Sequence, residues 1–275
     1  MQKYFVVTDV HSYYDEMMKA LEKAGYDKNN PEHIFVSCGD LFDRGSKSKE
    51  CLDYVLSIPK SRRIFIKGNH EQNLIDLIKE HRRFDESDRH NGTFKTMRHL
   101  CGTKSTKYDN IVKGLKENVK LKRYLKELKD FYRTEHYIFV HGWYPWCVIE
   151  DEDGKEKIKI IENDKGRWWK ARWMCGFSEW YRIKLIEQEC PEIEFPNEPI
   201  TVCGHWHTSY GHARYRNVGQ EFPDKGQRWK GNCCFDPFFA KNLIALDACT
   251  ALTHMCNCVV LEEPTGTVLY PKNNL

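Results

Sequence analysis

Three short apolar runs near the start of the chain each end in polar residues, and each is followed by a segment of helical periodicity. The runs cover residues 4–8, 34–38 and 63–67. Parallel strands need a crossover connection, usually a helix, so three strand–helix units in a row predict a parallel α/β sheet with helices packed on it. The polar residues would then gather at the carboxyl edge of the sheet, where such proteins bind ligands.

Later apolar runs extend this pattern. Residues 137–140 and 200–203 are predicted strands that also end in polar residues. Residues 243–247 and 256–261 are predicted closing strands, with 268–270 as a last edge strand.

The connections are predicted from local signals. Residues 12–15 have the form of a capping box for the first helix, and the third helix is expected over 73–80. Residues 151–165 are charged and predict a polar hairpin or loop, and 211–240 are expected to be irregular.

Residues 82–135 differ from the rest because they are basic and lack a strong strand pattern. Apolar residues recur there at roughly helical spacing: Ile111, Leu115, Val119, Leu121, Leu125 and Leu128. We predict a helical insertion at about 82–135 within a single domain of residues 1–275. Its segment 104–131 is expected beside the site, as a lid or substrate wall. The alternative is a solvated amphipathic helix with a basic outer face.

Composition limits the classes of function. A net charge of +3 over 275 residues does not favour nucleic acid as a partner, and no run is long and apolar enough for a membrane span. The first residues lack the layout of a signal peptide, so a cytoplasmic protein is expected. Twelve scattered cysteines then predict free thiols. Cys233-Cys234 and Cys256-Asn257-Cys258 are alternative half-sites for zinc, although their spacing is unusual for that role.

Residues with metal-binding side chains follow five of the predicted strands. They are Asp9 and His11, Asp40, Asn69, His141, and His205 with His207. In an extended chain residues two apart project to the same side, so Asp9 and His11 can converge on one ion. Oxygen and imidazole ligands without a thiolate suit Mn²⁺, Fe, Zn²⁺ or Mg²⁺.

The motifs resemble the signature of the calcineurin-like metallophosphoesterases: D-x-H at 9–11, G-D-x-x-D-R-G at 39–45, G-N-H-E at 68–71, H-G at 141–142 and G-H-x-H at 204–207. Arg44-Gly45 and Glu71 are similar to the phosphoprotein phosphatase branch. That branch includes bacteriophage and bacterial serine/threonine protein phosphatases and symmetrical diadenosine tetraphosphatases. The resemblance implies a four-layer α-β-β-α sandwich with two divalent metal ions, Mn²⁺ first among Mn²⁺, Fe, Zn²⁺, Ni²⁺ and Mg²⁺.

The resemblance also implies a role for each residue. The implied metal ligands are Asp9, His11 and His207 for the first ion, Asp40 for both, and Asn69, His141 and His205 for the second.

Four further residues have implied roles in the reaction. His70 would be the general acid, oriented by Asp43, and Arg44 would bind the phosphate. Arg172 is our candidate for the second substrate-binding arginine that is usual in the branch. The chain departs from its relatives at Asp247-Ala248-Cys249, where Asp-Thr-Gly is common, so Asp247 has no implied role.

The implied reaction is hydrolysis of a phosphoester by a metal-bridging hydroxide. The first candidate substrates are phosphomonoesters of the serine/threonine protein phosphatase type, on a phosphorylated protein or a small molecule. A dinucleoside polyphosphate hydrolase acting on diadenosine tetraphosphate is an alternative, because the tryptophan-rich stretch 168–180 could stack adenine. A phosphodiesterase or nuclease is a third, since Gly-His-x-His also occurs there. A binding module without catalysis would be expected to lack some ligands. The sequence makes no prediction of oligomeric state.

Overall fold

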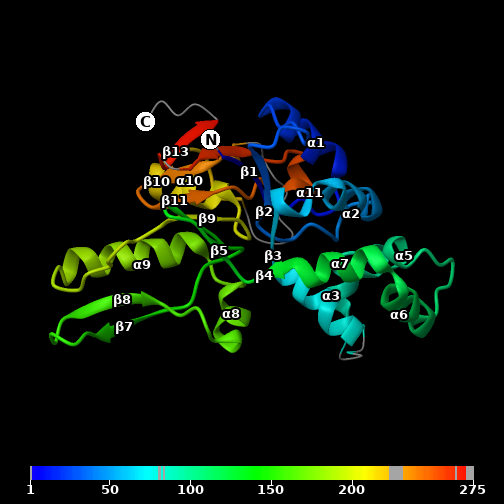
Figure 1. Ribbon diagram of the computed structural model, residues 1–275, viewed down its shortest axis with the longest axis horizontal. Coiled ribbons are helices and arrows are strands. Elements are labelled where there is room, and N and C mark those ends of the chain that lie inside the picture. Colours follow the sequence, from blue (N-terminus) through cyan, green and yellow to red (C-terminus); the bar gives the residue numbers. More distant parts are fainter. Residues whose placement is uncertain (1, 80–81, 83, 223–231, 264, 271–275) are drawn as a thin grey trace.

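Two β-sheets form the centre of the molecule (Figure 1). The computed structural model describes residues 2–79, 82, 84–222, 232–263 and 265–270. The first sheet has six strands in the order β13–β12–β1–β2–β3–β4. Their bounds are β1 (Lys3–Val7), β2 (His33–Ser37), β3 (Arg63–Ile66), β4 (Leu128–Lys129), β12 (Val259–Glu262) and β13 (Thr267–Tyr270). Strands β1 to β4 are parallel, which confirms the prediction from the first three strand–helix units.

The second sheet has five strands in the order β10–β11–β9–β6–β5. Their bounds are β5 (Tyr132–Arg133), β6 (Tyr137–Phe139), β9 (Ile200–Cys203), β10 (Phe238–Ala240) and β11 (Leu243–Ala245). Strands β6, β9 and β11 are parallel, so their carboxyl ends share one edge. A separate hairpin of β7 (Trp146–Glu150) and β8 (Glu156–Ile160) turns within the charged stretch, as predicted.

Helices cover the outer faces of both sheets. On the first sheet lie α1 (Tyr14–Lys23), α2 (Ser48–Ser57), α3 (Asn69–Lys79), α5 (Thr93–Cys101), α6 (Tyr108–Glu117) and α7 (Val119–Glu127). The 3₁₀ turn η1 (Lys60–Arg62) precedes β3, and α4 (Glu86–His90) packs on α5. On the second sheet lie α8 (Lys165–Ala171), α9 (Gly176–Glu189) and α10 (Thr208–Arg216), and the short α11 (Thr250–Thr253) precedes β12. Within the described ranges, none of these helices is long and apolar enough to cross a membrane.

Among the described residues, the alternating side chains of the strands separate three large cores, and a smaller cluster contains Phe235, Ala248 and Cys249. Successive residues of a strand point to opposite faces. On β1, Phe5 packs against the helices and Val6 against the second sheet; on β6, Phe139 packs against the first sheet and Ile138 against α8 and α9. The layers therefore follow the order helices, sheet, sheet, helices. This confirms the predicted α-β-β-α fold.

The segment 82–135 contributes α4 to α7 to the outer helical layer, beside α2 and α3 (Figure 1). Met97, Ile111 and Tyr124 are buried in the same core as Phe65 of β3. The segment ends in β4 and β5, which were not predicted, because two-residue strands are too short to produce a period. Its interpretation as a lid, and the single-domain interpretation, stay predictions.

Three local predictions were wrong. Helix α3 begins at Asn69 rather than at residue 73. No capping box forms, because Ser12 has a left-handed φ of 62° and its hydroxyl bonds that of Ser48. Helix α10 occupies part of the stretch expected to be irregular, of which 223–231 lie outside the described residues. Its Gly211 fits against Phe177, where a Cβ would lie 2.2 Å from the ring.

Candidate metal centre

The loops after β1 and β2 are hydrogen-bonded to each other through their backbones. The Asp9 amide donates to the Gly39 carbonyl at 3.1 Å, and the His11 amide donates to the Asp40 carbonyl at 2.9 Å. The Gly45 amide then donates to the His11 carbonyl at 2.9 Å. Two consecutive strand–helix units thus present their polar side chains to one place.

These loops have an unusual backbone. Six of the predicted site residues have φ between 49° and 75°, the left-handed region that non-glycine residues seldom adopt: Asp9, His11, Asp40, Asp43, Arg44 and His205. Each such residue costs of order 1–3 kcal/mol and persists only where its surroundings enforce it. Strain of this kind clusters at functional sites, and here it bends the chain so that the side chains converge.

Glycines allow the close approach of the chain to two site carboxylates. A Cβ on Gly68 would lie 2.1 Å from Asp40 Oδ1, and a Cβ on Gly204 would lie 2.1 Å from Asp9 Oδ2. The backbone amide of His205 donates to that same Asp9 oxygen at 2.9 Å. The glycines of the G-N-H-E and G-H-x-H motifs are therefore required by packing around the carboxylates.

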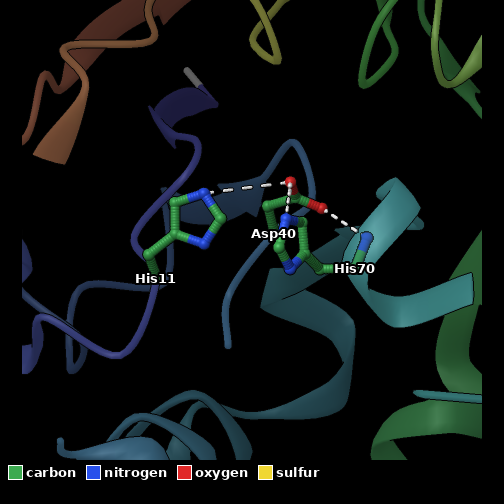
Figure 2. A group of neighbouring side chains, drawn as sticks. All are labelled: His11, Asp40 and His70. Carbon is green, nitrogen blue, oxygen red and sulfur yellow. Dashed lines mark hydrogen bonds and ion pairs between the residues drawn. The ribbon is translucent and has the colours of Figure 1, made fainter. Parts of the chain in front are cut away.

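Asp40 lies at the centre of the cluster. Its Oδ2 is 3.4 Å from His141 Nε2, 3.8 Å from His70 Nε2 and 3.9 Å from His11 Nε2. Figure 2 shows the side chains of His11, Asp40 and His70 pointing toward one another. Most of these separations are too long for hydrogen bonds. Two ligands that each lie about 2.1 Å from one ion are roughly 3–4 Å apart, so the spacing suits a cation.

The donor atoms form two groups that share Asp40. One consists of His11, Asp40 and His70, and the other of Asp40, His141 and His205. Asp9 Oδ1 lies 4.0 Å from His11 Nε2, beside the first group.

Asn69 belongs to the side of the second group, since its Oδ1 lies 2.8 Å from His141 Nε2. All the donors are oxygen or imidazole nitrogen, as Mn²⁺, Fe, Zn²⁺ and Mg²⁺ accept. The residues therefore suit divalent cations, and Asp40 is common to both groups.

Two imidazoles are fixed in orientation by backbone carbonyls. His11 Nδ1 lies 2.9 Å from the Phe42 carbonyl, and His141 Nδ1 lies 2.8 Å from the Cys38 carbonyl. A carbonyl only accepts, so Nδ1 carries the proton in both rings. Nε2 is then the atom of each ring that can bind a metal, an arrangement common among ligating histidines. In the metal-free protein, the Nε2 of His141 lies 2.8 Å from Asn69 Oδ1, which only accepts, so it holds a proton that a metal would replace.

In the metal-free cluster, the pKa values of Asp40, His141 and His205 all differ from those of the free side chains. Burial favours a raised pKa for Asp40, but the charges of His141 and His70 outweigh it and hold that pKa well below its usual range. Burial disfavours a proton on His141, but Asp40 outweighs burial and raises the pKa of His141 to about 10. Burial and the neighbouring His141 lower the pKa of His205 to about 3. A bound cation would replace the proton on His141 as the partner of Asp40.

His70 is paired with Asp43 on the side away from Asn69. His70 Nδ1 lies 2.7 Å from Asp43 Oδ2, and the backbone amide of His70 donates to Asp40 Oδ1 at 3.0 Å. Burial opposes a charge on His70, but Asp40 and Asp43 outweigh it and raise the pKa of His70. Asn69 and His70 both lie in the first turn of α3. Helical residues are about 100° apart, so Asn69 and His70 still diverge.

The two predicted phosphate-binding arginines differ in setting. Arg44, in the turn after β2, is exposed. Arg172 is only 4% exposed. Its Nη2 pairs with Asp130, which also accepts from Lys67, while its Nε and Nη1 are buried without a partner in the described parts of the chain. The Arg172 carbonyl lies against Gly142, next to His141.

His207 is not a member of either group. Its Nε2 is 3.9 Å from Asp247 Oδ2, and its ring contacts Phe222 and Phe235. Burial raises the pKa of Asp247 to about 6. Asp247 is thus a buried carboxylate beside the site whose position the sequence did not indicate.

Other metal-ligand candidates are less enclosed. Among the described residues, one further group consists of Glu135, His136 and Glu263, and no such group contains a cysteine. Glu263 Oε1 accepts from the backbone amides of Glu135 and His136, at 3.1 and 3.4 Å, and these hydrogen bonds explain why the three residues lie close together. All twelve cysteines are free, as predicted.

Sequence reasoning missed two positioning residues. Glu71 Oε2 accepts from the Asp40 and Gly68 amides at 2.8 and 2.9 Å, and Oε1 accepts from the Leu41 amide at 2.8 Å. Thr93 donates to Asp43, as described below. In the sequence, the role of Glu71 was indicated only by its place in the G-N-H-E motif. No sequence feature indicated the contact that Thr93 makes.

Fold and site together define a layered α/β protein with paired metal-binding groups at its strand ends, and comparison with known proteins gives the family. Residues 3–225 match the calcineurin-like phosphoesterase family. The chain belongs to this family, which confirms the resemblance seen in the motifs.

Relatives are similar over part of the chain. Symmetrical bis(5'-nucleosyl)-tetraphosphatase of Pasteurella multocida (strain Pm70) is 41% identical over 71 residues, 26% of this chain and 25% of that protein. The asymmetrical bis(5'-nucleosyl)-tetraphosphatase PrpE of Bacillus subtilis (strain 168) is 35% identical over 83 residues, 28% of this chain and 34% of that protein. The matches thus span a quarter to a third of these relatives.

A solved structure supports the fold alone. The cold-active protein-tyrosine phosphatase of a psychrophile, Shewanella sp., aligns with a TM-score of 0.53 at 16% identity. The alignment covers 96% of this chain and 76% of that one.

Proposed function

We propose that the chain is a two-metal phosphoester hydrolase. The proposed ligands are Asp9 and His11 for one cation, Asp40 for both, and Asn69, His141 and His205 for the other. The observation that carries the proposal is the position of Asp40 Oδ2, which lies 3.9 Å from His11 Nε2 in the loop after β1 and 3.4 Å from His141 Nε2 in the loop after β6. His207, which faces Asp247, stays a prediction as a ligand. Two divalent cations, Mn²⁺ first, would activate a water and neutralise phosphoryl charge.

His70 is the proposed acid for the leaving group. Its Nδ1 is held by the Asp43 carboxylate, so the proton available for donation is on Nε2. The neighbouring Asp40 and Asp43 raise the pKa of His70, which favours the protonated form that an acid requires. An alkoxide leaving group needs that proton, and this favours phosphomonoesters of serine, threonine or other alcohols as substrates.

Arg44 and Arg172 are the proposed phosphate ligands. Arg44 is exposed and available to a substrate. Arg172 supports the proposal because two of its buried guanidinium nitrogens have no hydrogen-bond partner among the described residues. A buried donor without a partner costs free energy, and a bound phosphate would supply the partner. A planar guanidinium also matches two phosphate oxygens.

A dinucleoside polyphosphate is the second candidate substrate. Two relatives carry the name bis(5'-nucleosyl)-tetraphosphatase, although over short matches. Trp173 is 44% exposed, and its ring lies edge-on to His205 with centroids 6.0 Å apart. An exposed indole beside the reacting group can stack a nucleobase.

The test of the metal site is Asp40→Asn. Because Asp40 serves both groups, we expect the variant to retain less than one cation per chain and to lose nearly all activity. Metal content by elemental analysis and hydrolysis of p-nitrophenyl phosphate with Mn²⁺ are measured. A fully active variant, or wild-type protein that binds no metal, overturns the proposal.

A substrate panel decides between the candidates. It contains a phosphoserine peptide, p-nitrophenyl phosphate, its bis-ester and diadenosine tetraphosphate. The first candidate predicts the highest kcat/KM for the monoesters. Preference for diadenosine tetraphosphate supports the second, with Trp173→Ala expected to raise KM for that substrate alone. Preference for the bis-ester would indicate a phosphodiesterase.

A further inference from the structure

The corner between α4 and α5 lies directly against the turn that carries Asp43 and Arg44. The Asn91 carbonyl accepts from the Arg44 amide at 2.8 Å, and Thr96 Oγ1 accepts from the Asp43 amide at 3.1 Å. Thr93 Oγ1 donates to Asp43 Oδ2 at 2.8 Å. Three hydrogen bonds from one corner of the helical segment thus hold two successive residues of the site.

The Asp43 carboxylate receives two donors on one oxygen. Oδ2 accepts from Thr93 Oγ1 at 2.8 Å and from His70 Nδ1 at 2.7 Å. Thr93 is 1% exposed and Asp43 is 2% exposed, so water cannot replace either bond easily. The terminal torsion of Asp is soft, and a single hydrogen bond leaves the carboxylate free to rotate. The hydroxyl of Thr93 therefore sets the plane in which Asp43 meets His70.

The corner has little freedom to move away from this turn. Gly92 has φ of 74°, and a Cβ there would lie 3.2 Å from the Arg44 amide nitrogen. Thr96 is fully buried, and its hydroxyl lies 3.5 Å from that of Ser48. Backbone contact and burial make the corner a rigid support.

We propose that Thr93 is a positioning residue through which the segment 82–135 orients the Asp43–His70 pair for proton donation. The inference rests on the proposed role of His70 as the acid. It gives this segment a part in the chemistry, whether or not the segment also contacts the substrate.

Thr93→Val tests the inference because it keeps the shape and removes the donor. With Mn²⁺ bound, we expect kcat for a phosphoserine peptide to fall about tenfold, the scale of one hydrogen bond to a charged group, with KM unchanged. The loss for p-nitrophenyl phosphate should be less than about threefold, since that leaving group needs little protonation. Thr93→Ser, which restores the hydroxyl, should recover most of the rate.

A matched control is Thr134→Val. Thr134 also bonds through its hydroxyl, to the Tyr137 amide at 3.0 Å in the turn before β6. It is expected to keep the wild-type rate on both substrates. Circular dichroism and metal content would show that all variants fold and bind metal.

A readout without turnover tests the contact itself. In metal-free protein, the proton on His70 Nδ1 should give a low-field resonance that Thr93→Val shifts or broadens and Thr134→Val leaves alone. Wild-type kcat together with an unchanged resonance overturns the inference, as does an equal loss on both substrates that Thr93→Ser does not restore. If His70→Asn keeps the wild-type kcat, the proposed role of His70 as the acid fails. If His70→Asn loses activity but Thr93→Val keeps the wild-type kcat and resonance, only the present inference is refuted.

Discussion

Asp40 makes contacts with several other residues of this site through its backbone and its carboxylate. Its φ is 53°, its amide donates to Glu71, and its Oδ1 accepts from the His70 amide. These bonds aim Oδ2 at three imidazoles. The direction of the Asp40 carboxylate depends on its strained backbone. Without the left-handed φ of Asp40, Oδ2 would point away from the three imidazoles.

At the same scale, His70→Asn separates acid catalysis from metal binding. We expect the variant to keep its metals, because Nδ1 of His70 is engaged by Asp43 and its Nε2 lies on the substrate side in our proposal. Turnover of a phosphoserine peptide should fall by about 10²–10⁴-fold. The loss should shrink for p-nitrophenyl phosphate.

The measurements are metal content and kcat on both substrates. His70 is also within the first group of potential ligands, so loss of one metal would assign it as a ligand. Equal slowing of both substrates, with chemistry rate-limiting, would likewise rule out the acid role.

At the scale of elements, Glu71 ties the first turn of α3 to two loops and to α7. Besides three backbone amides, it accepts from the Tyr124 hydroxyl at 3.3 Å. Burial, followed by the charge of Asp40, raises the pKa of Glu71. The carboxylate replaces the missing hydrogen-bond partners of amides that the bent loops leave inside the protein.

Glu71→Gln should therefore weaken the whole arrangement. The side-chain NH₂ of Gln is a donor, and it would face backbone N–H groups that now donate to a carboxylate oxygen. We expect the free energy of unfolding to fall by about 2–3 kcal/mol. Urea unfolding of the metal-free protein measures it. Tyr124→Phe removes only the longest of these bonds and should cost less than about 1 kcal/mol. Wild-type stability of Glu71→Gln would refute this account of the loops.

At the scale of the whole molecule, stability should respond to pH through His141. The folded metal-free protein holds a proton on His141 with a pKa near 10, while an unfolded histidine releases it at about 6.5. A pKa raised by folding contributes stability below pH 6.5 that is lost as the pH rises toward 10. The free energy of unfolding should thus fall by up to about 2 kcal/mol between pH 7 and pH 8.5.

Excess Mn²⁺ should abolish that slope, because a bound cation takes the place of the proton. Urea unfolding in chelator and in Mn²⁺ at both pH values measures the difference, and His141→Asn is the control in which the metal-free slope should vanish. Metal-free wild-type protein whose stability is flat or rises over this interval would falsify the expectation.

The sequence predicted the strands of the first sheet better than the elements of the segment 82–135. Strand–helix repetition is local and periodic, so β1, β2 and β3 were predicted within a residue or so. The two-residue strands β4 and β5 have no period, and only their neighbours in space make them strands. The hydroxyl of Thr93 gave no signal for a similar reason, since its partner is 50 residues away.

The sequence by itself determined the βα order, the family and the set of candidate metal ligands, because strand periodicity and motif spacing are properties of neighbouring residues. Only the tertiary structure decided that Asp40 lies between two groups of donors, that His207 faces Asp247, and that Arg172 is buried against Asp130. These are distances between residues on different elements. They depend on how left-handed loops and packed layers bring strand ends together, which no local pattern records.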